Sequence, residues 1–392
     1  MTGPTQLAPA AATITRIVAA AGLVLGCATH LSAQTLRVGD AVLEPVNSSV
    51  LPGFAEDDLG TALDTFRRGC AATPAPPSQP DTVMGAAVDL AAACAAAEAT
   101  QAPRVFFERH FSAYRVARPS RGSEATTGFL TGYFEPELVG SPTPGPGYTA
   151  PVLARPDDLV SLAPGETRPG LDPSLRAARR TPAGFEPYPD RAAIEDGALG
   201  ERARPLLWLR DAVDLFVLQV QGSGRVRLSD GRSVRVLYDG KNGRPYTSIG
   251  KLIVQEGHLP LEGLTLARWT GWLRREPEAA RRLMRANASY VFFRLAGIAD
   301  PRLGPPGAAG AALTPGRSLA VDGALWRYGL PFWLETRAAA PGRLVVAQDT
   351  GSAIVGPARG DLYLGTGEAA GIAAGTLRDA VSFVVLLPKP AP

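Results

Sequence analysis

The sequence predicts a mainly β protein with flanking helices, in which one β domain is inserted into another. Two helical stretches precede a long segment of turns and short strands, and further helices and strands follow it. Such an order is typical of an interrupted domain, because each block has to bury an apolar face of its own. With 392 residues, of which 45% are apolar and 20% charged, the chain is long enough for two cores.

The first 33 residues have the pattern of a secretory signal peptide. Residues 1–16 contain no acid and end in a cation, and residues 17–28 form an apolar run too short to span a bilayer comfortably. We expect cleavage after Ala33, which gives an exported, periplasmic protein. Lipidation of Cys27 is the alternative, and it would associate the protein with the outer membrane.

Composition and residue spacing argue against nucleic-acid binding and against a metal site. The formal net charge is +3, and no basic block is long enough to predict nucleic-acid binding. The histidines His30, His110 and His258 are scattered along the chain, so we expect no metal site.

Two cysteines, Cys70 and Cys94, remain after the expected cleavage. Each lies in a predicted helix, and export permits oxidation. We expect one disulfide that joins the two helices. Two buried free thiols are the alternative, because the sequence does not show whether the Cβ atoms approach each other.

The N-terminal elements are predicted to be helices. Residues 57–70 place Leu59, Leu63, Phe66 and Cys70 on one helical stripe. Residues 84–114 contain two helices, because Pro103 interrupts them.

The middle of the chain is predicted to be rich in strands. Residues 140–205 contain many Pro, Gly and Arg residues, which favours long loops between short strands. The apolar run Leu215–Gln221 is interpreted as a strand, and residues 225–238 as a hairpin that turns at Asp230-Gly231.

Alternation within the hairpin predicts which side chains enter the core. The inward set is Val226, Leu228, Val234 and Val236, and the outward set is Arg225, Arg227 and Arg235. We interpret the arginine face as solvated, with a ligand surface as the alternative.

Helices are expected to return after this hairpin. Thr247 or Ser248 can cap a helix that stops at Gly257, and residues 264–286 form a second helical region interrupted near Pro277. From Tyr290 onward the chain is again predicted to be rich in strands.

Three aspartates near the C-terminus, Asp322, Asp349 and Asp361, are the best indication of chemistry. Each lies where an apolar strand meets glycine or a turn. Burial and the proximity of other carboxylates both raise a carboxyl pKa, toward the range in which it can act as an acid.

Five segments in consistent order resemble a known family. They are Gly132-Tyr-Phe-Glu-Pro136, Val220-Gln-Gly-Ser-Gly224, Gly240-Lys-Asn-Gly-Arg-Pro-Tyr-Thr-Ser-Ile-Gly250, Asn287-Ala-Ser-Tyr-Val-Phe-Phe293 and the three-aspartate module. Over roughly residues 100–388 the chain resembles the membrane-bound lytic murein transglycosylase A family.

The resemblance implies a double-psi β-barrel domain, a second, smaller β-barrel domain inserted in it, and a groove between them for a glycan strand. After a signal peptide over residues 1–33, a helical region and the first part of the double-psi barrel would occupy 34–137. The inserted barrel would span 138–260, and helices with the rest of the double-psi barrel would span 261–392.

The resemblance also implies a carbon–oxygen lyase that acts on a polysaccharide. Such an enzyme cleaves the β-1,4 bond between N-acetylmuramic acid and N-acetylglucosamine in peptidoglycan without water, and leaves a 1,6-anhydromuramoyl end. A single carboxylate can serve as acid and then as base, whereas hydrolysis requires a second carboxylate or a positioned water. The family pattern assigns this role to Asp361, with Asp349 and Asp322 as supporting carboxylates.

The implied partner is the glycan strand of peptidoglycan, with no cofactor, and we expect a monomer. A noncatalytic peptidoglycan-binding protein on the same fold is the alternative function.

Candidate substrate contacts come from three segments. Gln221, Gly222 and Ser223 could hydrogen-bond the acetamido and hydroxyl groups of a sugar, or form a self-satisfied turn. Tyr133 and Glu135 open the inserted domain, and Tyr246 could supply an aromatic platform. Glu135 could instead belong to an ion pair, and the family has a threonine in its place.

Three short motifs match other proteins less well. Asp349-Thr-Gly351 occurs once, whereas an aspartic protease needs two such carboxylates. Ser248-Ile-Gly-Lys251 lacks the Lys-Thr-Gly of penicillin-binding enzymes, so we interpret the serine as a helix cap. Gly365–Gly371 has the wrong spacing for a dinucleotide loop and is interpreted as a glycine-rich loop.

Overall fold

The computed structural model describes residues 36–72, 88–118, 126–163, 166–336 and 342–389. The expected signal peptide, Ala33 and Cys27 lie outside these ranges. Within them, no helix combines the length and apolar character needed to cross a bilayer.

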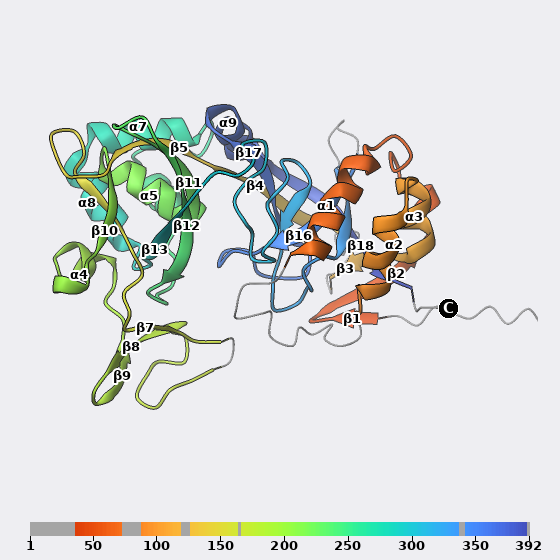
Figure 1. The fold of residues 1–392 in the computed structure, drawn as a ribbon, viewed down its shortest axis with the longest axis horizontal. Helices are drawn as coiled ribbons and strands as arrows, with labels where there is room; N and C mark the ends of the chain where they lie inside the picture. Colours follow the sequence, from red (N-terminus) through yellow and green to blue (C-terminus); the bar gives the residue numbers. More distant parts are fainter. Residues whose placement is uncertain (1–35, 73–87, 119–125, 164–165, 337–341, 390–392) are drawn as a thin grey trace, which may run out of the picture. The chain divides into compact units, whose positions relative to one another are not determined.

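A closed six-stranded barrel forms the first β domain (Figure 1). In spatial order its strands are β4 (Gly128–Glu135), β17 (Arg359–Thr366), β14 (Ser318–Ala320), β16 (Arg343–Asp349), β15 (Pro331–Thr336) and β18 (Arg378–Pro388), and β18 pairs with β4 to close the ring. The pairs β4–β17 and β14–β16 are parallel, and the other neighbours are antiparallel. A parallel pair needs a long crossover connection, and the second domain lies within the chain between β4 and β17.

Three more strands extend the sheet from β18, and three helices cover it. The strands are β3 (Phe111–Ala117), β2 (Ala41–Val46) and β1 (Leu36–Val38), and the helices are α1 (Leu59–Ala71), α2 (Ala91–Ala99) and α3 (Pro103–His110). Short 3₁₀ turns occur at Ser48–Val50 and Gly200–Arg202.

The helical stripe predicted in α1 is confirmed. Leu59, Leu63 and Phe66 are buried in the same core as the barrel strands, and Cys70 packs against it. Asp58 caps the helix, because its carboxylate accepts a hydrogen bond from the backbone amide of Thr61. The break at Pro103 is also confirmed, since Pro103 is the first residue of α3.

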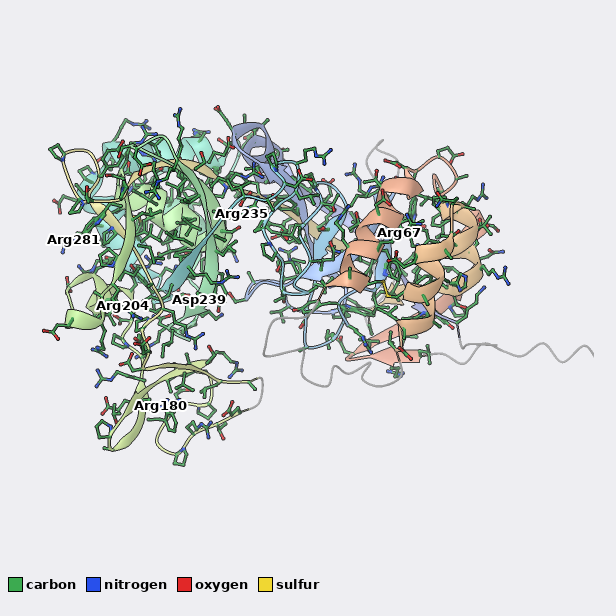
Figure 2. The ribbon with its side chains drawn as sticks, viewed as in Figure 1. Arg67, Arg180, Arg204, Arg235, Asp239 and Arg281 are labelled. Carbon is green, nitrogen blue, oxygen red and sulfur yellow. A yellow bond between two sulfur atoms is a disulfide. The ribbon has the colours of Figure 1, made fainter. Side chains whose placement is uncertain are left out.

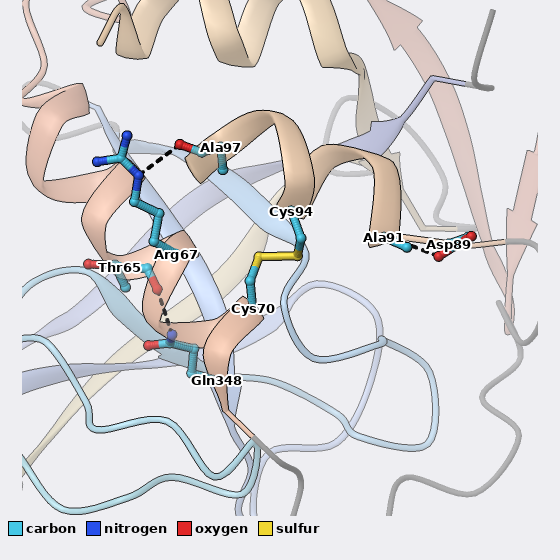
Figure 3. Close-up of a disulfide and its surroundings, with 8 residues drawn as sticks. All are labelled: Thr65, Arg67, Cys70, Asp89, Ala91, Cys94, Ala97 and Gln348. Carbon is cyan, nitrogen blue, oxygen red and sulfur yellow. Dashed lines mark hydrogen bonds between the residues drawn. A yellow bond between two sulfur atoms is a disulfide. The ribbon is translucent and has the colours of Figure 1, made fainter. Parts of the chain in front are cut away.

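A disulfide joins α1 and α2 (Figure 3). The Cα atoms of Cys70 and Cys94 lie 5.6 Å apart. The guanidinium of Arg67 donates to the carbonyl oxygen of Ala97 at 2.8 Å, so the helices are also linked by a hydrogen bond beside the sulfurs. The side-chain amide of Gln348 donates to the carbonyl of Thr65 at 2.9 Å and ties α1 to β16.

A second six-stranded sheet forms a nearly closed barrel. Its order is β13 (Val291–Ala296), β12 (Ser233–Lys241), β11 (Ser223–Leu228), β5 (Glu137–Ser141), β10 (Pro205–Leu209) and β6 (Ala150–Leu153). A single bridge between Ala154 and Phe293 brings the two ends of the sheet together. The two barrels confirm the predicted fold class, and β13 shows that this sheet includes a strand beyond residue 260.

Smaller elements surround the second barrel. A separate three-stranded sheet contains β7 (Leu159–Ser161), β8 (Ala177–Thr181) and β9 (Gly184–Pro187). The helices are α4 (Arg191–Glu195), α5 (Ala212–Gln221), α6 (Ile249–Gln255), α7 (Leu266–Arg275) and α8 (Pro277–Ala286), and a last helix, α9 (Glu368–Thr376), packs on β4 and β17.

The predicted hairpin is β11–β12, and its turn contains Gly231 at φ +88°. Val226, Leu228 and Val236 are buried as predicted, and Val234 is partly buried against the same core. The predicted solvation of the outward face is wrong for Arg225, whose side chain is 12% exposed, and for Arg235, which is only 5% exposed. The guanidinium of Arg235 is covered by Glu135 of β4 and by the loop that contains Leu303.

Two other predictions are wrong. Leu215–Gln221 is the main part of the helix α5 and not a strand. Leu215 and Leu218 enter the core of the second barrel, whereas Phe216 packs among the helices α6–α8. The helix is therefore apolar all round. The stretch Gly365–Gly371 is not a loop throughout, because α9 begins at Glu368.

The helical predictions after the hairpin are confirmed. Ser248 caps α6, with its hydroxyl accepting from the amide of Lys251 at 3.4 Å. The helical region near Pro277 is divided into α7 and α8 at that residue.

Removal of the disulfide should destabilise the helical layer. The two cysteines are 24 residues apart, and closing a loop of that length stabilises a protein by about 3 kcal/mol through the entropy of the unfolded chain. We expect Cys70→Ser/Cys94→Ser to lower the free energy of unfolding in urea by about this amount. Reductant should lower the free energy of unfolding of the unmodified protein by the same amount and should leave that of the double variant unchanged. Equal stability of all samples would contradict the prediction.

Candidate functional site

The register of three strand pairs brings the candidate residues together. In the parallel pair β4–β17, Thr131 lies opposite Asp361. On the other side of β17, Ala320 of β14 lies opposite Asp361, and Ala320 is also opposite Asp349 of β16. The four strands therefore place Thr131, Asp361, Ala320 and Asp349 in one row across the barrel wall.

Asp361 is partly buried and has one oxygen committed to the protein. The hydroxyl of Thr131 donates to Oδ1 at 2.6 Å. Within the described residues, no hydrogen bond to Oδ2 is found. Removal from water raises the pKa of Asp361 to about 6, with a further contribution from the negative charge of Asp349; the Thr131 bond and the positive charge of Arg359 act in the opposite direction. Near neutral pH a carboxyl with this pKa is mostly ionised and keeps a minor protonated fraction, so both the acid and the base form are present.

Arg359 orients the hydroxyl that binds Asp361. Its Nη2 atom donates to Oγ1 of Thr131 at 2.7 Å, so the hydroxyl proton is directed to the carboxylate. Arg359 also donates to the carbonyl oxygen of Gly360, and it lies over the ring of Phe129 at 5.4 Å. Neither Thr131 nor Arg359 was predicted, although each is two residues from a candidate on the same strand, Tyr133 or Asp361, and therefore shares its face.

Asp349 is engaged by three donors. The hydroxyl of Tyr133 donates to Oδ2 at 2.7 Å, and the amides of Ala308 and Thr350 donate to Oδ1 at 3.0 and 2.9 Å. Burial raises the pKa of Asp349, and these hydrogen bonds act in the opposite direction. Burial and the charge of Asp349 raise the pKa of Tyr133, so the phenol keeps its proton and remains the donor.

Asp322 has a different environment. Its Oδ1 accepts from the amide of Ala324 at 3.0 Å and its Oδ2 from the amide of Gly356 at 2.7 Å. Asp322 therefore joins two loops of the barrel, and no described hydrogen bond connects it to Asp361.

Glu135 is fully buried at the end of β4, where it meets the second barrel. Arg235 (labelled in Figure 2) donates from Nε to Oε1 at 2.7 Å, and Arg225 donates from Nε to Oε2 at 2.9 Å. Thr366 of β17 also donates to Oε2 at 2.9 Å. All these partners favour the ion-pair interpretation of Glu135 over direct sugar contact.

The remaining candidates lie at the start of β11 and before α6. Oε1 of Gln221 accepts from the amide of Phe134 at 3.2 Å, which links α5 to β4. Gly222 ends α5 at φ +79°, and Ser223 is largely buried at the first position of β11. Tyr246 is 40% exposed. In the described ranges no group of three or more His, Cys, Asp or Glu side chains is arranged to hold a metal ion.

Replacement of Thr131 by Val should change the titration of Asp361. The bond from the hydroxyl stabilises the ionised carboxylate, so its loss should raise the pKa of Asp361 further above about 6 and increase the protonated fraction at neutral pH. Carbon NMR of labelled aspartate carboxyls against pH measures the midpoint. Thr131→Ser keeps the hydroxyl and should titrate like the unmodified protein. An unchanged midpoint in the Val variant would count against the bond.

Glu135→Gln should destabilise the protein strongly. Removal of the carboxylate leaves two largely buried guanidinium groups without a compensating charge, which costs about 3–5 kcal/mol. Urea unfolding measures this cost. The control is Glu186→Gln, which breaks a pair with Arg179 in which the glutamate side chain is 51% exposed, and this should cost under about 1 kcal/mol. Equal losses in the two variants would contradict the structural role assigned to Glu135.

Comparison with known proteins places the chain in a family. The family model of the MltA specific insert domain matches residues 129–294, and that of the 3D domain matches residues 317–387. Membrane-bound lytic murein transglycosylase A of Vibrio cholerae is 34% identical over 198 residues, which cover 48% of this chain and 52% of that protein, so the match spans about half of the relative's length.

Solved structures match over nearly their whole length. The membrane-bound lytic murein transglycosylase from Agrobacterium tumefaciens is 34% identical, with a TM-score of 0.77 and coverage of 88% of this chain and 97% of that one. MltA from Neisseria gonorrhoeae in its monoclinic form is 30% identical, with a TM-score of 0.73 and coverage of 92% and 96%. The chain therefore belongs to the membrane-bound lytic murein transglycosylase A family.

Proposed function

We propose that this protein is a peptidoglycan lytic transglycosylase. It cleaves the β-1,4 bond between N-acetylmuramic acid and N-acetylglucosamine, and it releases a 1,6-anhydromuramoyl end without consuming water. The observation that carries the proposal is a partly buried Asp361 whose pKa is about 6 and whose Oδ2 accepts no hydrogen bond from the residues that the structure describes.

Asp361 acts first as an acid and then as a base. Protonated Oδ2 gives its proton to the glycosidic oxygen while the bond from that oxygen to C1 of the muramoyl residue breaks. The ionised carboxylate then takes the proton of the C6 hydroxyl of the same sugar, and O6 forms a bond to C1. The carboxyl is protonated again at the end, so one residue completes the cycle.

The surroundings of Asp349 support a reaction without water. Hydrolysis of a glycoside uses a second carboxylate as nucleophile or as base for a water. Both oxygens of Asp349 already accept hydrogen bonds from Tyr133, Ala308 and Thr350. In this proposal Asp349 tunes the pKa of Asp361, and Asp322 supports the loops.

Substrate contacts complete the proposal. The glycan strand lies in a groove between the two barrels, where Gly222, Ser223, Tyr133 and Tyr246 contact its sugars. Gln221 and Glu135 act less directly, because Gln221 binds the backbone of β4 and Glu135 is fully buried. The protein is exported to the periplasm, where peptidoglycan is found, and works as a monomer.

The end group of the product tests the reaction. Purified protein is incubated with isolated sacculi, and the released muropeptides are measured by mass spectrometry. Products lighter by one water than hydrolytic muropeptides are expected. Reducing muramoyl ends would show that water attacks, and binding without release would identify a noncatalytic peptidoglycan-binding protein.

Asp361→Asn should abolish release while sacculus binding persists. The amide cannot donate a carboxylic proton, and loss of general acid catalysis costs about 10²–10⁴-fold in rate. Asp379→Asn on β18 is the matched control and should keep the rate of the unmodified protein, because no step of the mechanism uses Asp379. Release by the Asp361 variant at the unmodified rate would exclude Asp361 as the acid.

A further inference from the structure

Lys241 is an unusual cation in this chain. Only three lysines occur, Lys241, Lys251 and Lys389, and almost all other positive charge is carried by arginine. Lys241 is the last residue of β12, opposite Val291 of β13, and its side chain is partly buried. Lys241 takes no part in the proposed reaction.

The ammonium group of Lys241 has no protein acceptor in the described parts of the chain. None of the hydrogen bonds or ion pairs found there involves its Nζ atom. Burial lowers the pKa of Lys241, and the positive charge of Arg176 lowers it further. A partly buried cation next to another cation is unfavourable, and an anionic ligand would relieve that cost.

Two arginines flank the same stretch of backbone, and neither pairs with a carboxylate of the described residues. Arg176 donates from its amide to the carbonyl of Gly243 at 3.1 Å, and its guanidinium binds the carbonyl of Pro173. Arg155 lies against Gly240 and donates to the backbone carbonyl of Asp239 at 3.0 Å. The guanidinium groups of Arg155 and Arg176 thus bind uncharged carbonyl oxygens, whereas that of Arg235 pairs with the carboxylate of Glu135.

Lys241 and Arg176 are therefore defined as the cationic cluster. We propose that this cluster binds a carboxylate carried by the muramoyl residues of peptidoglycan, with Lys241 as the direct ligand. The proposal rests on the proposed function for the nature of the polymer. It goes further in that it assigns a site which distinguishes an anionic peptidoglycan strand from a neutral chain of N-acetylglucosamine.

An extended polymer can reach this cluster from the candidate sugar contacts. Ser223 pairs with Leu237 of β12, and Lys241 is four residues further along that strand. At about 3.3 Å per residue this is at most roughly 13 Å, because the strand is irregular between Tyr238 and Gly240. The carboxylate could belong to the peptide stem, or to the lactyl group when the stem has been removed, and both offer the same acceptor to an ammonium group.

Binding to three soluble strands tests the cluster. They are glycan strands that carry peptide stems, strands stripped of stems so that the lactyl carboxylate is free, and a neutral chito-oligosaccharide. Titration calorimetry uses the full exported chain with Asp361→Asn, so that strands are not cut. Lys241→Gln should weaken binding of the stem-bearing strand by roughly tenfold and leave binding of the neutral strand unchanged.

Two control variants complete the design. Lys241→Arg keeps the charge and should restore most of the affinity. Lys251→Gln removes a lysine on the exposed side of α6 and should bind all three strands as the parent does. Weakened binding of the stem-bearing strand alone would identify a carboxylate of the peptide as the ligand, and weakened binding of the stripped strand alone would identify the lactyl carboxylate. Weakened binding of both anionic strands would show that the site accepts either carboxylate.

Two results would overturn the proposal. Lys241→Gln could bind both anionic strands as tightly as Lys251→Gln does. Alternatively, it could lose affinity for the neutral oligosaccharide to the same extent, which would mean that Lys241 contacts the sugar or supports the fold. Failure of the proposed function is seen separately, as the absence of muropeptide release by the protein with Asp361 intact.

Discussion

The parallel pairing of β4 with β17 is the constraint on which the candidate site depends. It sets Thr131 beside Asp361 and Tyr133 beside Tyr363, so a one-residue slip would turn each of these side chains to the opposite face. Close packing on the opposite face of β4 stabilises this register. A Cβ atom at Gly132 would lie 2.7 Å from Leu364 and 3.0 Å from the backbone of α9. The absence of a Cβ at Gly132 thereby helps to fix Thr131 as the neighbour of Asp361 on the other face.

The strand β4 also connects the candidate site to the second barrel. β4 ends at Glu135, where Arg225 and Arg235 come from the hairpin and Thr366 comes from the end of β17. Both arginines also bind the carbonyl of Leu303, in the segment that returns from the second barrel to the first. One buried carboxylate thus accepts hydrogen bonds from three strands, β11, β12 and β17, and its burial is tolerable because each oxygen is paired.

The sequence could predict elements whose pattern is local. The stripe of α1, the break at Pro103, the cap at Ser248 and the turn at Gly231 depend on residues close to each other in the chain, and all four are found. The prediction of a strand for α5 is wrong because the helix lies between two cores and has no polar face. Its sequence therefore lacks the alternation of apolar and polar residues by which a helical period is recognised. Asp361 could be selected by resemblance, but its partners Thr131 and Arg359 depend on a register that no local pattern contains.

The two halves of the Thr131–Asp361 bond are 230 residues apart in the chain. A contact so distant in sequence carries a large loop-closure cost, and it cannot form until nearly the whole polypeptide is present. The inserted barrel has to be accommodated before β17 can pair with β4. Asp361 therefore acquires its hydroxyl partner among the last events of folding, and a chain that is still being synthesised has no assembled candidate site.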